Sequence, residues 1–319
     1  TPIVNGITIS REFENSCKNM QTELIRQQFN HPSILMWGYM NEVFGDMNWG
    51  VNAYLLPDEK KSRMIKTAEL AQKLDSLTRA EDSSRVTVMA IDKSTRYDEV
   101  GMCNIPQVLG FNLYQGWYYD EFSDFGKYVD DYHTKYPQKP FIISEYGAGS
   151  FQALHSYLPI RYDHSMEWQE QFIESYFQQI MSRPYISGAS QWNFVDFVAE
   201  NRGDYTPHYN NKGILTATRQ PKSIYWFYQA SLSEKPVLKF ALNGWNNRIG
   251  LPTIATDSVS LEHIKLYSNA EIVTLFDNGK LVDSIKPINS TVVFDVPMNT
   301  GKHHLVAKAK KVGWNYYMV

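Results

Sequence analysis

A strand–helix repeat dominates the first part of the chain. From residue 1 to about 230, short apolar runs alternate with segments whose apolar residues recur at helical spacing. The runs that we expect to be strands are SILMWGYM, RVTVMAI, VLGFNLY, PFIISEY and ISGASQWNF, after a stub in TPIVN. Helices are expected near residues 11–29, 60–77, 125–136 and 167–181, and from Pro221. The pattern predicts an α/β fold with parallel strands, either a (β/α) barrel or a doubly wound sheet.

The number of repeats bears on the size of the whole protein. Five full strands and a stub fall short of the eight strands that close a (β/α)8 TIM barrel. If the fold is a barrel, about two and a half units are expected to precede this sequence. We therefore expect the chain to be the later part of a larger protein, with residues 1–232 running from the end of the third barrel strand to the eighth helix.

The pattern changes after residue 236 to short runs that mostly alternate between apolar and polar residues. Such runs, separated by turn residues, predict an antiparallel, all-β immunoglobulin-like sandwich over residues 236–319. The segment LFDNGKL predicts a hairpin, because Asn278 and Gly279 both tolerate the positive φ values of a type I′ turn.

Charge and composition exclude several classes of partner. The 31 Lys and Arg residues against 34 Asp and Glu residues give a net charge of −3, which offers no electrostatic basis for binding nucleic acid or an anionic membrane. No apolar run approaches the roughly 18 residues of a membrane span. The N-terminal segment TPIVNGITIS lacks the features of a signal peptide, so we expect any export signal to lie outside this sequence.

Cysteine and histidine residues give no sign of a metal centre. Cys17 and Cys103 are too few for a disulfide framework, and we expect both to be free buried thiols. The eight histidines include no H-E-x-x-H motif, and His303 and His304 fall in a predicted strand. We predict no metal and no cofactor.

Two of the predicted strands end on carboxylates. SILMWGYM is followed by Asn41 and Glu42, and PFIISEY carries Glu145 three strands later. In a barrel the carboxyl ends of the strands form the rim where ligands bind, so both side chains are expected in one cleft. Carboxyl carbons about 5 to 6 Å apart would suit double displacement at a sugar anomeric carbon. Either glutamate alone could instead be a salt-bridged or helix-capping residue.

The segments around these glutamates resemble a known family. NHPSILMWGYMNE resembles the acid/base signature of glycoside hydrolase family 2, which contains β-galactosidases, β-glucuronidases and β-mannosidases, and PFIISEYGAG is similar to its nucleophile segment. The resemblance continues through GASQWNFVDF, NNKGILTATRQPKSIYWFYQA and IKLYSNAEIVTLFDNGKLV. It implies a retaining exo-β-glycosidase that hydrolyses a β-glycoside or oligosaccharide, with Glu145 as nucleophile and Glu42 as acid and then base.

The resemblance also implies substrate-binding residues. Asn41 would hydrogen-bond the sugar 2-hydroxyl, Tyr114 would donate a hydrogen bond that orients Glu145, and Trp192 would form the floor of the sugar pocket. The alternatives are a strand-end cap for Asn41, a plain rim aromatic for Tyr114 and a core residue for Trp192.

The identity of the sugar stays open at this point. Asn210 and Lys212, in the segment NNKG, match an Asn-x-Lys pattern with which β-glucuronidases bind a carboxylate sugar, but similar segments occur in relatives described as β-galactosidases. We expect a β-galactosidase first, with a β-glucuronidase or a non-catalytic carbohydrate-binding homologue as alternatives. A homo-oligomer formed by the full-length protein, and a periplasmic or secreted location typical of bacterial polysaccharide-degrading enzymes, are further expectations.

Overall fold

The structure is a computed structural model that describes residues 2–48, 50–200, 202–203, 208–241, 244–250, 252, 258–313 and 317–318. Thr1 and Val319, the outer limits of the two predicted domains, lie outside the described residues. The chain divides into two compact units. The first consists of Thr1–Gln115, Ser123–Tyr146 and Gln179–Gln191, and the second of Gly116–Phe122, Gly147–Gln178 and Trp192–Val319.

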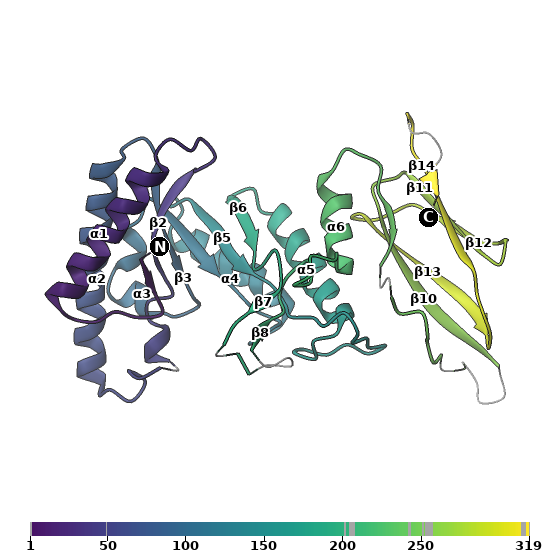
Figure 1. The fold of residues 1–319 in the computed structure, drawn as a ribbon, viewed down its shortest axis with the longest axis horizontal. Helices are drawn as coiled ribbons and strands as arrows, with labels where there is room; N and C mark the ends of the chain where they lie inside the picture. The colour runs from purple at the N-terminus through teal and green to yellow at the C-terminus, as the bar shows by residue number, and fades with distance from the viewer. Residues whose placement is uncertain are drawn as a thin grey trace. The chain divides into compact units, whose positions relative to one another are not determined.

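The first unit is built on a parallel sheet whose six strands are neighbours in sequence order, from β1 to β6 (Figure 1). They are β1 (Ile3–Val4), β2 (Met36–Asn41), β3 (Val86–Ile91), β4 (Val108–Asn112), β5 (Phe141–Tyr146) and β6 (Ile186–Gln191). A doubly wound sheet reverses its strand order at a switch point, whereas a barrel keeps it sequential. The order therefore identifies a (β/α) barrel sheet, and the prediction of five full strands after a stub is confirmed, with β1 as the stub.

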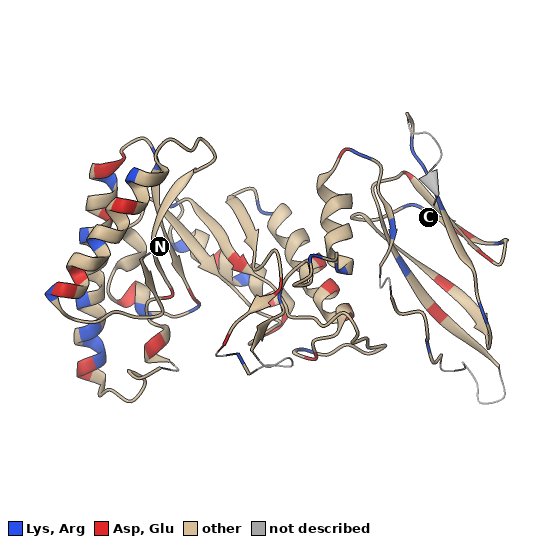
Figure 2. Ribbon diagram, in the orientation of Figure 1, with Lys and Arg blue, Asp and Glu red and all other residues tan. Residues whose placement is uncertain are grey.

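The expected helices are present, with ends shifted by a few residues. They are α1 (Arg11–Gln28), α2 (Pro57–Glu81), α4 (Phe122–Lys135), α5 (Met166–Met181) and α6 (Ser223–Leu232), and a short α3 (Arg96–Glu99) was not predicted. Ser10 caps α1 by accepting a hydrogen bond from Phe13 N at 3.1 Å. Basic and acidic residues alternate with other residues along α1 and α2 (Figure 2), and Glu14 on α1 pairs with Lys73 on α2 at 2.7 Å. No helix of the described chain has the length and apolar character needed to cross a membrane.

Asp82, the residue after α2, ties this helix to β2. Its Oδ2 accepts a hydrogen bond from Trp37 Nε1 and lies 2.8 Å from Arg85 Nη1. Burial alone would raise the pKa of the Asp82 carboxyl, but hydrogen bonds from Ser84, Trp37 and Arg85 outweigh burial and hold that pKa well below its usual range. The ionised carboxylate therefore stabilises the start of β2.

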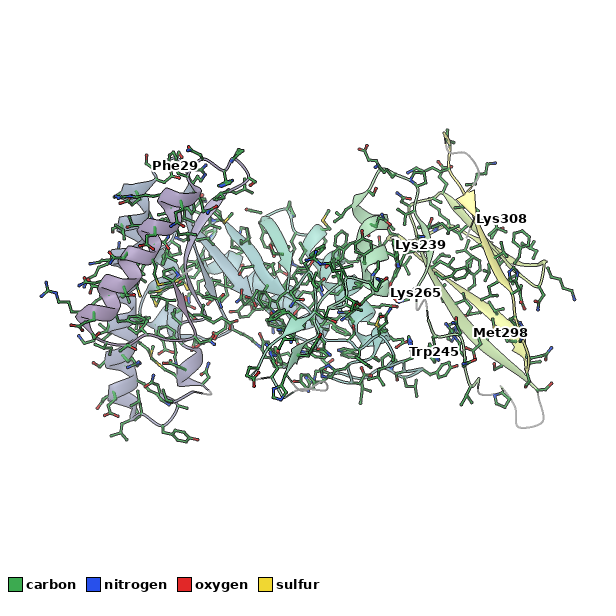
Figure 3. The ribbon with its side chains drawn as sticks, viewed as in Figure 1. Phe29, Lys239, Trp245, Lys265, Met298 and Lys308 are labelled. Carbon is green, nitrogen blue, oxygen red and sulfur yellow. The ribbon has the colours of Figure 1, made fainter. Side chains whose placement is uncertain are left out.

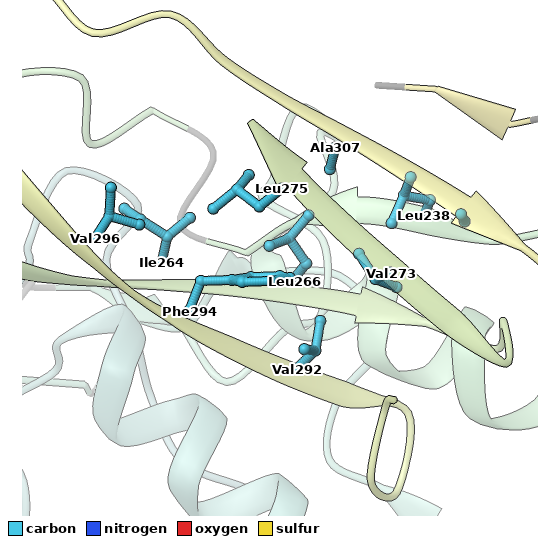
Figure 4. Packing of buried hydrophobic residues seen from close by; sticks show 10 residues of the cluster. Leu238, Ile264, Leu266, Val273, Leu275, Val292, Phe294, Val296 and Ala307 are labelled. Carbon is cyan, nitrogen blue, oxygen red and sulfur yellow. The ribbon is translucent and has the colours of Figure 1, made fainter. Parts of the chain in front are cut away.

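From Leu238 onward, the second unit contains two antiparallel sheets, with strand orders β13-β10-β9 and β12-β11-β14-β15. Their strands are β9 (Leu238–Phe240), β10 (Val259–Ser268), β11 (Ile272–Asp277), β12 (Lys280–Ile285), β13 (Thr291–Asn299), β14 (Leu305–Lys310) and β15 (Tyr317–Met318). The sheets enclose apolar side chains that include Leu238, Leu266 and Phe294 (Figure 4). This arrangement confirms the predicted immunoglobulin-like sandwich. The placement of the domain boundary between residues 232 and 236 stays a prediction.

Two local predictions are confirmed. Asn278 and Gly279 have φ values of +48° and +78°, and their neighbours Asp277 and Lys280 pair across β11 and β12, which is a two-residue hairpin turn. Cys17 and Cys103 are free and buried.

A partly buried ion cluster joins α5 to β10 within the second unit. Lys265 Nζ lies 2.9 Å from Glu170 Oε2 and 3.0 Å from Glu174 Oε1, and Tyr267 donates a hydrogen bond to Glu174 Oε1 at 2.7 Å (Lys265 is labelled in Figure 3). Burial raises the pKa of Glu170, and Lys265 opposes that shift. Burial would lower the pKa of Lys265, but the two carboxylates dominate and raise it. Each charge in the cluster therefore depends on a partner from the other element.

Candidate active site

The chain turns sharply out of the sheet at Glu42, directly after β2. Glu42 N still donates to Ala90 O of β3 at 3.0 Å, while Gly45 N donates to Glu42 O at 2.8 Å. The φ of Glu42 is +48°, in the left-handed region. This conformation costs a non-glycine residue about 1 to 2 kcal/mol, and such backbone strain clusters at functional sites.

Glu145 lies on β5 and is held by Tyr114. Tyr114 follows the last residue of β4 by two positions, is buried, and donates its phenolic hydrogen bond to Glu145 Oε2 at 2.8 Å. A donor to a carboxylate favours the ionised form, which a nucleophile requires. The contact is the one that the family resemblance implies for Tyr114, and the catalytic role of both residues stays a prediction.

Asn112, the last residue of β4, links the two carboxylate segments. Its Nδ2 donates to Asn41 Oδ1 and to Glu42 Oε1, both at 3.0 Å, and its Oδ1 accepts from Ser144 Oγ at 2.7 Å. Asn112 is also the register partner of Glu145 in the sheet. Asn112 was not predicted from the sequence, although a lone amide inside a buried apolar run is itself a signal, because such a group needs hydrogen-bond partners.

In this network Asn112 is the donor. An amide nitrogen has two hydrogens, and Asn112 uses one on Asn41 and one on Glu42. Glu42 Oε1 must accept, so a proton on this carboxyl is expected on Oε2. Asn41 Oδ1 also accepts, which leaves its amide nitrogen as the donor for a ligand. Within the described parts of the chain, no group of three or more His, Cys, Asp or Glu side chains could hold a metal ion.

The second unit places Lys212 among aromatic rings. Lys212 is 1% exposed, donates to Tyr118 Oη at 2.7 Å, and has its ammonium 5.6 Å and 4.9 Å from the ring centroids of Trp117 and Tyr118. Asn210, the last residue of the short strand β8 (Tyr209–Asn210), is buried, and its Oδ1 accepts from Lys212 N at 3.3 Å. Asn210 and Lys212 were predicted from the sequence, whereas Tyr118 was not. The arrangement provides a buried cation that an anionic group could pair with.

Trp192 follows the last residue of β6. Its partly buried ring meets Phe197 edge-on, with ring centroids 6.1 Å apart. Phe197 lies on β7 (Phe197–Val198), which pairs with β8. Trp192, Asn210 and Lys212 thus belong to the second unit, and the expected role of Trp192 as a pocket floor stays a prediction.

Comparisons with known proteins give a consistent result. Residues 2–234 match the family model described as "Glycosyl hydrolases family 2, TIM barrel domain". A β-glucuronidase of Bacteroides fragilis is 30% identical over 246 residues, which cover 74% of this chain and 32% of that protein. The crystal structure of a Bacteroides uniformis β-glucuronidase superposes with a TM-score of 0.91 at 35% identity, covering 99% of this chain and 37% of the other.

A second solved structure is that of Bacteroides uniformis β-glucuronidase 2 covalently bound to cyclophellitol-6-carboxylate aziridine. It matches with a TM-score of 0.92 at 35% identity, again over 99% of this chain and 37% of the other. The chain spans about a third of the length of the curated relatives that it matches.

Proposed function

Because this chain belongs to glycoside hydrolase family 2, we propose that the protein containing it is a retaining exo-β-glycosidase, and specifically a β-glucuronidase. The observation that carries the proposal is the hydrogen-bonded set at the ends of β2, β4 and β5. In this set Asn112 holds Glu42 while Tyr114 holds Glu145. Double displacement needs one carboxylate kept ionised and a second carboxyl held to deliver a proton, and the two glutamates are held by different donors.

In the first step, Glu145 attacks the anomeric carbon and forms a glycosyl ester while the bond from that carbon to the leaving-group oxygen breaks. Glu42 gives its proton to the departing oxygen. The hydrogen bond from Tyr114 stabilises Glu145 as the anion before attack. Asn112, by donating to Oε1 of Glu42, orients the acid so that Oε2 carries the proton.

In the second step, water attacks the same carbon and releases Glu145. Glu42, now a carboxylate, takes the proton from that water. Asn41 would donate a hydrogen bond from its amide nitrogen to the sugar 2-hydroxyl oxygen, a contact that strengthens as positive charge develops on the sugar ring.

The choice of sugar rests on charge. Lys212 is a buried ammonium within an Asn-x-Lys segment, and a carboxylate is the ligand group that such a cation pairs with best. The three relatives described above are named β-glucuronidases, and one of them is covalently bound to cyclophellitol-6-carboxylate aziridine. These names support the alternative raised from the sequence over the first expectation, a β-galactosidase.

Hydrolysis of 4-nitrophenyl β-glycosides by the full-length protein tests the proposal. We expect kcat/KM for the glucuronide to exceed that for the galactoside and the mannoside by about 100-fold, the size of one charge-assisted contact. Lys212→Met should remove most of this preference. A preference for the galactoside would refute the sugar assignment, and a folded protein that hydrolyses none of the three would refute the enzyme assignment.

A further inference from the structure

Lys222, the residue before α6, is buried in the second unit, and its ammonium group donates all of its hydrogens to protein acceptors. It is 1% exposed, and its Nζ donates to Asp196 Oδ1 at 2.9 Å, Ser150 O at 3.0 Å and Asn211 O at 2.9 Å. An ammonium has three hydrogens, so each of them has one acceptor. Lys222 therefore cannot contact a ligand directly.

The acceptors of Lys222 include the main chain of the Asn-x-Lys segment. Asn211, the middle residue of that segment, also accepts on its carbonyl from Ser150 N at 3.0 Å, and its side-chain Nδ2 lies 3.1 Å from His164 Nδ1. Asn211 is 3% exposed. The residue between Asn210 and Lys212 is thus held through both its backbone and its side chain.

Asp196, the carboxylate that pairs with Lys222, holds the end of the Asn-x-Lys segment. Asp196 Oδ1 accepts from Gly213 N at 2.8 Å as well as from Lys222. A Cβ on Gly213 would lie 2.4 Å from Asp196 N and 2.5 Å from Leu215 O, so any other residue would force the backbone apart. Lys212 itself is tied by its carbonyl, which accepts from Asn193 N at 3.1 Å.

We infer that the Lys222–Asp196 pair is a positioning device that presets Asn210 and Lys212 for the carboxylate of a sugar acid, and so sets the preference for uronic over neutral β-glycosides. The inference rests on the proposed function. A preformed segment loses little conformational freedom when the ligand binds, so the affinity for the carboxylate is greater than in a segment that must order itself.

The chemistry of the pair supports a role beyond packing. Burial lowers the pKa of Lys222 and raises that of Asp196, and the attraction between the two opposes both shifts. A protein in which apolar residues of similar volume replace a buried ion pair is often as stable as the original protein. Apolar side chains could not, however, form hydrogen bonds with the carbonyls of Ser150 and Asn211 or with the amide of Gly213.

The test uses the full-length protein and two 4-nitrophenyl substrates, the β-glucuronide and the β-glucoside, which differ only at C6. Lys222→Met should raise KM for the glucuronide by about 10- to 100-fold, the range for losing one charge-assisted contact, and change kcat/KM for the glucoside by less than about threefold. Lys265→Met is the matched control, because it also removes a lysine that pairs with a buried carboxylate, and neither carboxylate partner of Lys265 lies in Asn210–Lys212. It should lower the unfolding temperature without changing the glucuronide-to-glucoside ratio.

Should Lys222→Met fail to fold, the double variant Lys222→Met/Asp196→Asn leaves no lone buried charge and keeps an acceptor for Gly213 N. This variant should fold and still show a reduced ratio. The inference is refuted if a folded Lys222 variant keeps the wild-type ratio, or if Lys265→Met lowers the ratio equally. A wild-type protein that cleaves neither substrate would instead refute the proposed function.

Discussion

Replacing Asn112 with alanine tests whether one buried amide sets the geometry of the acid. The change removes the donors to Asn41 Oδ1 and Glu42 Oε1, and the acceptor of Ser144. A hydrogen bond to a charged group contributes about 1.5 to 3 kcal/mol and a neutral one about 1 kcal/mol. The expected loss of transition-state stabilisation is therefore about 2 to 4 kcal/mol, which corresponds to about 30- to 900-fold in kcat/KM.

The assay is a series of aryl β-glucuronides whose leaving groups differ in pKa. Because Asn112 acts through the acid, Asn112→Ala should slow poor leaving groups more than activated ones, which need little protonation. Ser144→Ala is the control, since it removes only the hydrogen bond to Asn112 Oδ1 and leaves both amide donors in place. We expect it to lower kcat/KM by less than about tenfold, the effect of one neutral hydrogen bond. Equal losses for all leaving groups, or equal losses in the two variants, would refute the reasoning.

Three other predictions concern separate parts of the chain. Glu145→Gly should abolish turnover, and added azide should restore it with a product of inverted anomeric configuration, measured by NMR. Glu42→Ala should mainly slow the hydrolysis of substrates with poor leaving groups. Identical responses of the two variants would contradict the assigned roles. Replacing Asn278-Gly279 with Val-Val should lower the unfolding temperature of the sandwich, because β-branched residues resist positive φ; an unchanged temperature would count against the turn argument. Since the pKa of Asp82 is lower in the folded than in the unfolded protein, its stabilisation is present above about pH 4 and is lost as pH falls. Asp82→Asn should therefore lower the urea midpoint at pH 7 more than at pH 3, and equal shifts would argue against this linkage.

The sequence predicts the barrel sheet well because its signals are local. Continuous apolar runs mark parallel strands, and a carboxylate that ends such a run, as Glu42 and Glu145 do, points to the rim of the sheet. The Asn278-Gly279 turn was predictable because two adjacent residues determine its backbone.

The missed residues depend on contacts between distant parts of the chain. Tyr118 and Lys212 are 94 positions apart, and no spacing rule connects a phenol to a lysine at that distance. Asn112 sits inside an apolar run, and its partners on β2 and β5 become visible only once the whole sheet is assembled. The two-residue strands β7 and β8 are too short for periodicity to reveal.

The ion cluster between α5 and β10 restricts how this protein could have been assembled by recombination. Glu170 is 1% exposed and lies 2.9 Å from Lys265, so a sandwich domain exchanged from another gene would have to supply a cation at that strand position. A domain without one would leave a buried carboxylate unpaired, a change that typically destabilises by about 3 to 5 kcal/mol. The helix and the sandwich are therefore expected to be inherited together, and chimeras that join them from different parents should express poorly unless both sides of the cluster are transferred.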